Sequence, residues 1–289
     1  MAILASRCLL VALGATVLLL ENACGSSETD TDPFGGAEEV QTDYTGPDTR
    51  LGKGQMTGSG RTTEQYEKAD VSRDGVNYQL MANGWGDGWE SHAISWNGTS
   101  FTVESLEGSL GPNYQPAAYP TVFCGVYSSS ASGDCGLPAA IDSLTSVQTG
   151  WRWAPNGNTG EYNAAYDVWL GNGPTIGDHS GFFMVWFRKP PGQSPAGTFS
   201  EVVSVENVPG QWSLYVGTVN DWLPIINYVR APRSDTYAME FDLLDFIADA
   251  RSRGLTIPGT HILGVAVGFE VWNGPINNLE SVDFYVDVR

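Results

Sequence analysis

The stretch GVAVGFEVWNG, residues 264–274, is apolar throughout except for one carboxylate, that of Glu270. Its pattern predicts a β-strand, in which successive side chains point to opposite faces. The three valines then share a core face, whereas Glu270 and Trp272 lie on the other face among small residues. Burial raises the pKa of a carboxyl group, and acids with a raised pKa serve as general acids. Two interpretations are open for this strand alone: Glu270 is the acid of a site, or it faces solvent near a sheet edge.

Short alternating runs of this kind recur along most of the chain, separated by Gly, Pro and Asn. The predicted strands are 93–95, 99–104, 144–153, 163–170, 182–187, 200–205, 211–217, 225–230, 261–272 and 282–288. Many short strands at such spacing indicate a β-sandwich or jelly roll. One segment, 240–253, has apolar residues at helical spacing and stops at Gly254. We therefore expect an all-β domain with one α-helix over residues 71–289, a sufficient length for a single core.

The first 24 residues have the pattern of a secretion signal. Arg7 precedes an apolar run, 8–20, that is too short for a membrane span. Cys24 follows a small residue and precedes a polar tail, which resembles a bacterial lipoprotein processing site. Two outcomes follow: a cell-surface lipoprotein anchored through Cys24, or a freely secreted protein. Residues 25–70 are rich in Gly, Ser, Thr and Asp, and we expect them to form a disordered linker.

The chain is strongly acidic, with a formal net charge of −19 from 33 acidic and 14 basic residues. This balance argues against nucleic acid and anionic membrane as partners, because phosphate binding needs clustered Lys and Arg. It leaves a neutral partner such as a sugar polymer, and membrane contact only through a lipid anchor. Cys124 and Cys135 form the remaining pair in an oxidising compartment and predict a disulfide. The three histidines are scattered, so we expect no metal site and no cofactor.

Three of the predicted strands carry a polar or aromatic second face. Asp167 shares such a face with Trp169, as Glu270 does with Trp272. The strand 181–187 presents Phe182, Met184 and Trp186. Two lone acids beside Trp suit a cleft that binds a sugar chain and protonates a glycosidic oxygen, a reaction that normally takes two carboxyl groups. Asp167 taken alone also fits a buried, hydrogen-bonded structural acid.

Eight short motifs, in order along residues 78–288, resemble those of glycoside hydrolase family 12, which contains mainly endo-β-1,4-glucanases and xyloglucanases. They are NGWG at 83–86, AYP at 118–120, CGLP at 135–138, SVQTGW at 146–151, NAAYDVWL at 163–170, QWSLY at 211–215, EFDLLDF at 240–246 and GFEVWNG at 268–274. The resemblance implies a jelly-roll β-sandwich of the concanavalin-like kind with a concave sugar-binding cleft. It also implies β-1,4-glucan or xyloglucan as the partner, and we expect the protein to act as a monomer.

The same resemblance assigns roles to individual residues. Glu270 is the expected general acid/base, and Asp167 matches an auxiliary carboxylate that hydrogen-bonds the nucleophile. The substrate-binding residues that the resemblance implies are Asn83, Trp85, Met184, Tyr215 and Trp272, with Tyr215 standing where the family has a second Trp.

One position departs from the family pattern. The family nucleophile is the Glu of E-x-M-x-W, whereas residues 182–186 read FFMVW, so Phe182 stands at the nucleophile position. A ring cannot form a glycosyl-enzyme ester, and a retaining mechanism is therefore not expected. Three functions are open. The first is a hydrolase in which Glu270 is the acid and Asp167 or Asp178 is the base for water. The second is a catalytically silent β-glucan-binding protein in which Phe182 adds a stacking surface, and the third is a structural surface lipoprotein without a sugar ligand.

Overall fold

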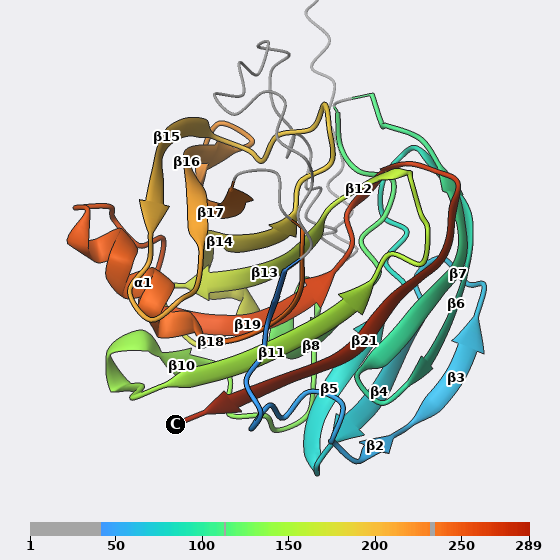
Figure 1. Cartoon of the computed structure of the whole chain (residues 1–289), viewed down its shortest axis with the longest axis horizontal. Helices are drawn as coiled ribbons and strands as arrows, with labels where there is room; N and C mark the ends of the chain where they lie inside the picture. Colours follow the sequence, from blue (N-terminus) through green and yellow to red (C-terminus); the bar gives the residue numbers. More distant parts are fainter. Residues whose placement is uncertain (1–41, 113, 232–234) are drawn as a thin grey trace, which may run out of the picture.

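The computed structural model describes residues 42–112, 114–231 and 235–289. In this part of the chain two large sheets pack face to face, accompanied by one two-stranded sheet and one α-helix (Figure 1). The architecture is the predicted jelly-roll β-sandwich. Each predicted strand coincides with an observed one, although the run 261–272 is divided into two strands at Phe269 and Glu270.

The smaller sheet has seven strands within the described residues, and its neighbours are antiparallel except for the parallel pair β1 and β18. Their order across the sheet is β1 (Thr42–Tyr44), β18 (Thr236–Asp242), β11 (Val147–Ala154), β21 (Ile276–Val288), β7 (Ser100–Gly108), β6 (Trp89–Asn97) and β3 (Ser59–Thr62).

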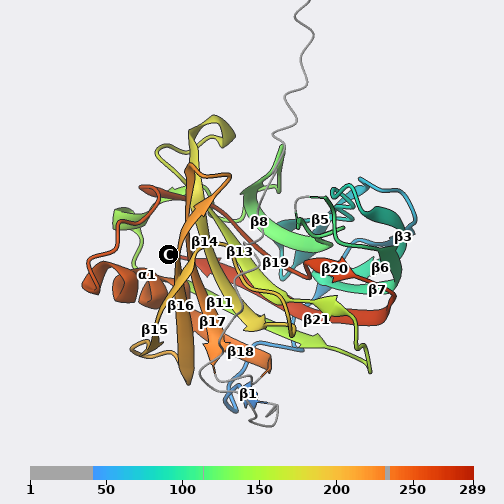
Figure 2. The same cartoon turned by 90° about the horizontal axis from the view of Figure 1, so that it is seen from above.

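The larger sheet is strongly twisted, so that in Figure 2 its strands β14 and β16 stand nearly across β5 and β8. Its strand order is β15 (Thr198–Ser204), β16 (Gln211–Val219), β17 (Leu223–Ala231), β14 (His179–Arg188), β13 (Ala164–Gly171), β19 (His261–Gly268), β8 (Thr121–Tyr127), β5 (Val76–Met81), β4 (Lys68–Arg73) and β2 (Met56–Thr57). Four short strands complete the picture: β10 (Ala139–Ala140) pairs with β19, β9 (Ser130–Ala131) with β8, and β12 (Glu161–Tyr162) with β20 (Val271–Asn273).

Alternation along the strands of the larger sheet produces two apolar layers. In β13, Tyr166 and Val168 belong to the core between the sheets, whereas Ala165 and Trp169 point to the opposite face. We call the buried residues on that opposite face the outer-face cluster. Its members are Met81, Tyr119, Phe123, Tyr127, Ala165, Trp169, Phe182, Met184, Trp186, Ala196, Tyr215, Val219, Leu223, Ile225, Val229, Leu263, Ala266 and Trp272.

The helix α1 (Leu243–Ser252) begins three residues later than the sequence predicts, because Glu240–Asp242 continue β18 along β11. The Asp242 side chain caps the helix by accepting a hydrogen bond of 3.0 Å from the Leu244 N–H. The helix ends before Gly254, which has a φ of +78° and therefore suits glycine. The 3₁₀ turns are η1 (Ile141–Ser143) and η2 (Ile176–Asp178). No helix among the described residues is long and apolar enough to cross a membrane.

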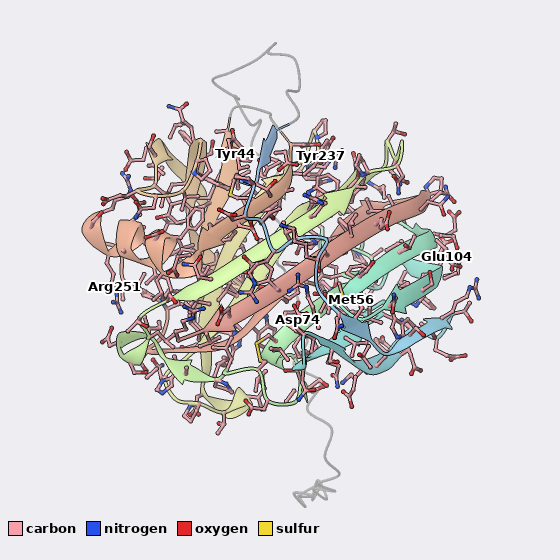
Figure 3. The ribbon with its side chains drawn as sticks, turned by 60° about the horizontal axis from the view of Figure 1, so that its bottom comes forward. Tyr44, Met56, Asp74, Glu104, Tyr237 and Arg251 are labelled. Carbon is pink, nitrogen blue, oxygen red and sulfur yellow. A yellow bond between two sulfur atoms is a disulfide. The ribbon has the colours of Figure 1, made fainter. Side chains whose placement is uncertain are left out.

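The prediction of a disordered linker is wrong for residues 42–70, where the structure has β1 to β4. These polar strands were missed because they gain their stability from the edges of existing sheets rather than from an apolar pattern. Between β1 and β2 the chain crosses the face formed by β11 and β21 (Figure 3), and Leu51 is buried there against Ala238 and Tyr285. The remainder of the predicted linker, the signal segment 1–24 and Cys24 lie outside the described residues. The predicted disulfide joins Cys124 of β8 to Cys135.

Candidate active site

Glu270 lies at the break between β19 and β20, where Asn163 replaces the regular strand pairing. The Glu270 N–H donates to Asn163 Oδ1 at 2.9 Å, and the Asn163 N–H donates to the Glu270 carbonyl at 2.9 Å. The Asn163 amide also donates from Nδ2 to Glu270 Oε2. The faces follow the prediction, because Val265 belongs to the core between the sheets and Trp272 to the outer-face cluster. The Glu270 side chain is therefore held on the outer face of the larger sheet.

The environment of Glu270 favours its protonated form. Burial is the main cause that raises the pKa of Glu270 from an ordinary value of 4.5 to about 8, and the negative charge of Asp167 adds to it. The hydrogen bond from Asn163 acts in the opposite direction. At neutral pH Glu270 thus carries a proton that it can donate.

Asp167 is a buried carboxylate on the same face. In the sheet it lies opposite Met184 of β14 and Ala266 of β19. Its Oδ2 accepts hydrogen bonds from Tyr127 Oη at 2.9 Å and from Trp169 Nε1 at 3.1 Å. Burial raises the pKa of Asp167 to about 6, and these two hydrogen bonds oppose the rise. Asp167 is therefore mostly ionised at neutral pH, while Glu270 is mostly protonated.

Phe182 lies beyond Asp167 on this face, because β14 places it opposite Trp169. Along the direction of β13, the outer face therefore carries first the pair Asn163 and Glu270, then Asp167, and then the pair Trp169 and Phe182. The Phe182 ring meets Trp169 edge-on at a centroid distance of 5.4 Å, and it is only 4% exposed. The expectation that Phe182 adds a stacking surface is therefore wrong, because neighbouring rings already cover this ring.

Asp178, the other predicted base, is engaged elsewhere. It sits in the turn η2, where its Oδ2 accepts hydrogen bonds from the Thr175 N–H at 2.9 Å and from Thr175 Oγ1 at 2.7 Å. These bonds lower the pKa of Asp178, whose side chain is partly exposed. Its carboxylate caps a turn, so the structure supports Asp167 rather than Asp178 as the partner of Glu270.

The comparisons with known proteins identify the family of this chain. Residues 76–289 match the sequence model of glycosyl hydrolase family 12. The chain belongs to this family. A relative, the probable xyloglucan-specific endo-beta-1,4-glucanase A of Aspergillus fumigatus, is 23% identical over 216 residues, which cover 71% of this chain and 89% of the relative.

Solved structures of family 12 proteins share the fold. Endoglucanase Cel12A from Rhodothermus marinus is 30% identical, with a TM-score of 0.69, over 80% of this chain and 99% of that chain. A metagenome-derived glycoside hydrolase family 12 endoglucanase is 28% identical, also with a TM-score of 0.69, over 81% of this chain and 99% of that chain. The family resemblance that the sequence motifs indicated is confirmed.

The structure of this family 12 protein brings the predicted substrate-binding residues to the outer face or its border. Met184, Tyr215 and Trp272 are members of the outer-face cluster, and Trp85 is partly exposed against its edge. Asn83 borders the cluster, since its amide donates to the Tyr119 carbonyl at 3.1 Å. Trp272 is fully buried beside Trp186, with a centroid distance of 5.8 Å.

Two residues of the candidate site escaped the sequence interpretation. Asn163 was missed because its partner Glu270 lies 107 positions away. Glu161, two residues before Asn163, accepts hydrogen bonds from Asn273 Nδ2 and, at 3.3 Å, from Gln193 Nε2. Two Glu–Asn pairs therefore link the segment 161–163 to the segment 270–273: Glu161 bonds to Asn273, and Glu270 bonds to Asn163. No spacing rule in the sequence indicates these pairs.

His179 is the third residue that was missed, and a β-bulge is the reason. Leu170 pairs with Gly181 but Gly171 pairs with His179, so the register shifts by one residue. A bulge reverses the side on which the following side chain points. The His179 ring therefore stacks on Trp169, at 4.2 Å and 19°, and contacts Phe182 at 4.8 Å.

Several buried polar atoms on the outer face of this family 12 protein have no hydrogen-bond partner among the described residues. They are Asp167 Oδ1, His179 Nε2, Trp186 Nε1 and Asn227 Oδ1. Asn227 shares the face because it lies opposite Met184 and Tyr215. Buried polar atoms are nearly always paired, so a concentration of unpaired ones marks a face that is suited to a polar ligand.

Proposed function

We propose that this protein is an extracellular hydrolase of β-1,4-glucan or xyloglucan that works by single displacement. Glu270 donates its proton to the glycosidic oxygen, and Asp167 accepts a proton from the attacking water. The observation that carries the proposal is the placement of two buried carboxyl groups on one face, Glu270 held by Asn163 and Asp167 held by Tyr127 and Trp169. Burial raises the pKa of Glu270 to about 8 and that of Asp167 to about 6. Such a separation assigns the acid and base roles at neutral pH.

The chemistry of the outer face supports a carbohydrate as the ligand. A glucan has hydroxyl groups for the unpaired polar atoms of that face and apolar ring faces for its aromatic side chains. The net charge of −19 is compatible with a neutral polymer. The names of the relatives, which include xyloglucan-specific endo-beta-1,4-glucanase and endoglucanase, point to β-1,4-linked glucose as the backbone.

Phe182 favours a second function, a β-glucan-binding protein without activity. Phe182 stands where the family resemblance expects the nucleophile, and its ring is packed between Trp169 and His179. Without a nucleophile the double-displacement route is closed, and only attack by water remains. In this second function the outer face binds the glucan and releases it unchanged.

One experiment separates the two functions. The purified protein is incubated with xyloglucan and with barley β-glucan, reducing ends are assayed, and Glu270→Gln serves as the matched control. Release above the control supports the hydrolase, and ¹H NMR of the first products is expected to detect inverted anomers. No release, together with binding of cellohexaose in a calorimetric titration, supports the binding protein. Absence of both release and binding removes both functions.

A further inference from the structure

His179 occupies a position that strand alternation would not give it. The register shift at Leu170 and Gly171 turns the His179 ring to the outer face of the sheet, where Phe182 also lies. Regular alternation would place residues three positions apart on opposite faces. Bulges are frequent next to active sites, where they re-aim a single side chain. The ring is fixed there by the parallel stack on Trp169, whose own N–H holds Asp167.

The hydrogen bonds of His179 determine which nitrogen is available. The ring makes one hydrogen bond to the backbone of Gly181, and this bond favours the protonated ring, so a ring N–H donates to the carbonyl. The donor is Nδ1, because Nε2 has no partner among the described residues. In the neutral ring the other nitrogen carries the lone pair. Nε2 is therefore a hydrogen-bond acceptor on the outer face.

The neutral form of His179 is the stable one in this environment. Burial lowers the pKa of His179 from its ordinary value to about 4, and the Gly181 bond only partly opposes this effect. A neutral imidazole nitrogen between two aromatic rings accepts a hydrogen bond from a hydroxyl group without introducing a charge. The unpaired Asp167 Oδ1 belongs to the carboxylate that accepts the hydrogen bond from the Trp169 indole N–H. Trp169 therefore contacts two residues that each carry an unpaired acceptor.

We propose that His179 is a substrate-binding residue, whose Nε2 accepts a hydrogen bond from a hydroxyl group of the glucosyl unit that lies between Glu270 and Phe182. This inference rests on the proposed binding of β-1,4-glucan to the outer face. With this role, His179 contacts the glucosyl unit from the Phe182 end of the outer face, and Glu270 contacts it from the other end. A residue that only filled space could be replaced by another ring without loss of affinity, so the role can be tested.

The test uses the full-length protein with Glu270→Gln, so that cellohexaose is bound and not cleaved. His179→Phe keeps a ring on Trp169 and removes both nitrogens. We expect it to weaken cellohexaose binding about tenfold by calorimetry, the size of one hydrogen bond to a buried acceptor. In ¹⁵N NMR of the Glu270→Gln protein, the Nε2 signal of His179 is expected to move on addition of cellohexaose. The ring of His92 is the internal control, because both of its nitrogens have partners.

The outcomes are distinguishable. If His179→Phe binds cellohexaose as tightly as its parent, the role of His179 is overturned while the proposed function stands. If His179→Phe does not fold, the Nε2 signal decides, and a signal that stays in place with ligand bound overturns the role. If the Glu270→Gln parent binds no cellohexaose or xyloglucan oligosaccharide, the proposed function fails and the inference fails with it.

Discussion

Asn163 and Glu270 are joined by three hydrogen bonds. One links the two main chains, one links the Glu270 main chain to the Asn163 side chain, and one links the two side chains. The pair lies at the break between β19 and β20. Glu270 therefore takes no part in the regular strand pairing, and the Asn163 amide orients its carboxyl group. The amide stabilises the ionised carboxylate, whereas burial and the charge of Asp167 stabilise the protonated one. The pKa of Glu270 is thus set by opposing contacts that can be removed one at a time.

Removing the amide raises the pKa of Glu270 further. In Asn163→Ala the hydrogen bond that favours the charged form is lost, so Glu270 stays protonated to higher pH. ¹³C NMR titration of the Glu270 carboxyl measures this value directly. We also expect slower hydrolysis, because the acid is less well oriented. Asn156→Ala, which removes an amide contact to Glu280 on the smaller sheet, is the control and leaves the Glu270 titration unchanged. A lower pKa of Glu270 in Asn163→Ala contradicts this account.

Removing the charge of Asp167 has the opposite effect. Asp167→Asn deletes the negative charge that raises the pKa of Glu270, so its titration moves to lower pH while the effect of burial remains. The same NMR titration checks the direction. Tyr127→Phe, which removes a hydrogen bond to Asp167 but keeps its carboxyl group, serves as the comparison. An unchanged pKa of Glu270 in Asp167→Asn means that the two carboxyl groups are not coupled.

Glu270 is also expected to make stability depend on pH. Its pKa is about 8 in the folded chain against an ordinary value of 4.5, so its stabilising contribution is complete below pH 4.5 and is lost as pH rises towards 8. Glu270→Gln mimics the protonated form and avoids this loss. Its Tm is expected to exceed that of the native protein by at least several °C at pH 8 and to approach it below pH 4.5. Glu280→Gln, with a similar Asn contact, is the control, and a difference that grows towards low pH contradicts the sign.

The sequence predicted those features that depend on periodicity. The side chains alternate between faces along β13, along β14 from Phe182 and along the chain from Val265 to Trp272, so Asp167 and Trp272 could be placed on one face. His179 could not, because a bulge resets the alternation. The strand break at Glu270 was also hidden, since it depends on Asn163, a residue distant in sequence. Patterns report local geometry, whereas bulges and the Glu–Asn pairs depend on contacts between strands.

The same reasoning explains why β1 to β4 were missed and predicts how they are held. Arg73, at the end of β4, donates from Nε to Asp283 Oδ1 at 2.8 Å and from Nη2 to Asp283 Oδ2 at 3.1 Å, and both side chains are almost fully buried. Asp283→Ala breaks the buried ion pair and leaves Arg73 with only the exposed carboxylate of Asp74, and it is expected to cost about 3–5 kcal/mol in urea unfolding. Glu104→Ala removes the partner of Arg61 in an exposed ion pair and is expected to cost less than about 1 kcal/mol. Similar losses in both variants would mean that the N-terminal strands are not anchored by Arg73.

Phe182→Glu tests whether the rest of the family 12 machinery is intact. The new carboxylate would stand opposite Trp169, one level from Asp167, whose Oδ1 has no partner among the described residues. A carboxylate there can attack the sugar, so we expect hydrolysis at least about tenfold faster and products that retain the anomeric configuration. Burying the new charge is expected to cost about 1–3 kcal/mol of stability, because the Phe182 site is apolar and the native ring is only 4% exposed.

Phe182→Gln is the matched control, since it has the shape of Glu without a nucleophile. Reducing-end assays on xyloglucan compare the rates of the two variants, and ¹H NMR of the first products reads the anomer. Both variants are compared at equal folded fraction, measured by circular dichroism. If folded Phe182→Glu is no faster than Phe182→Gln, the replacement of the nucleophile is not what limits this protein, and other contacts around Glu270 have changed with it.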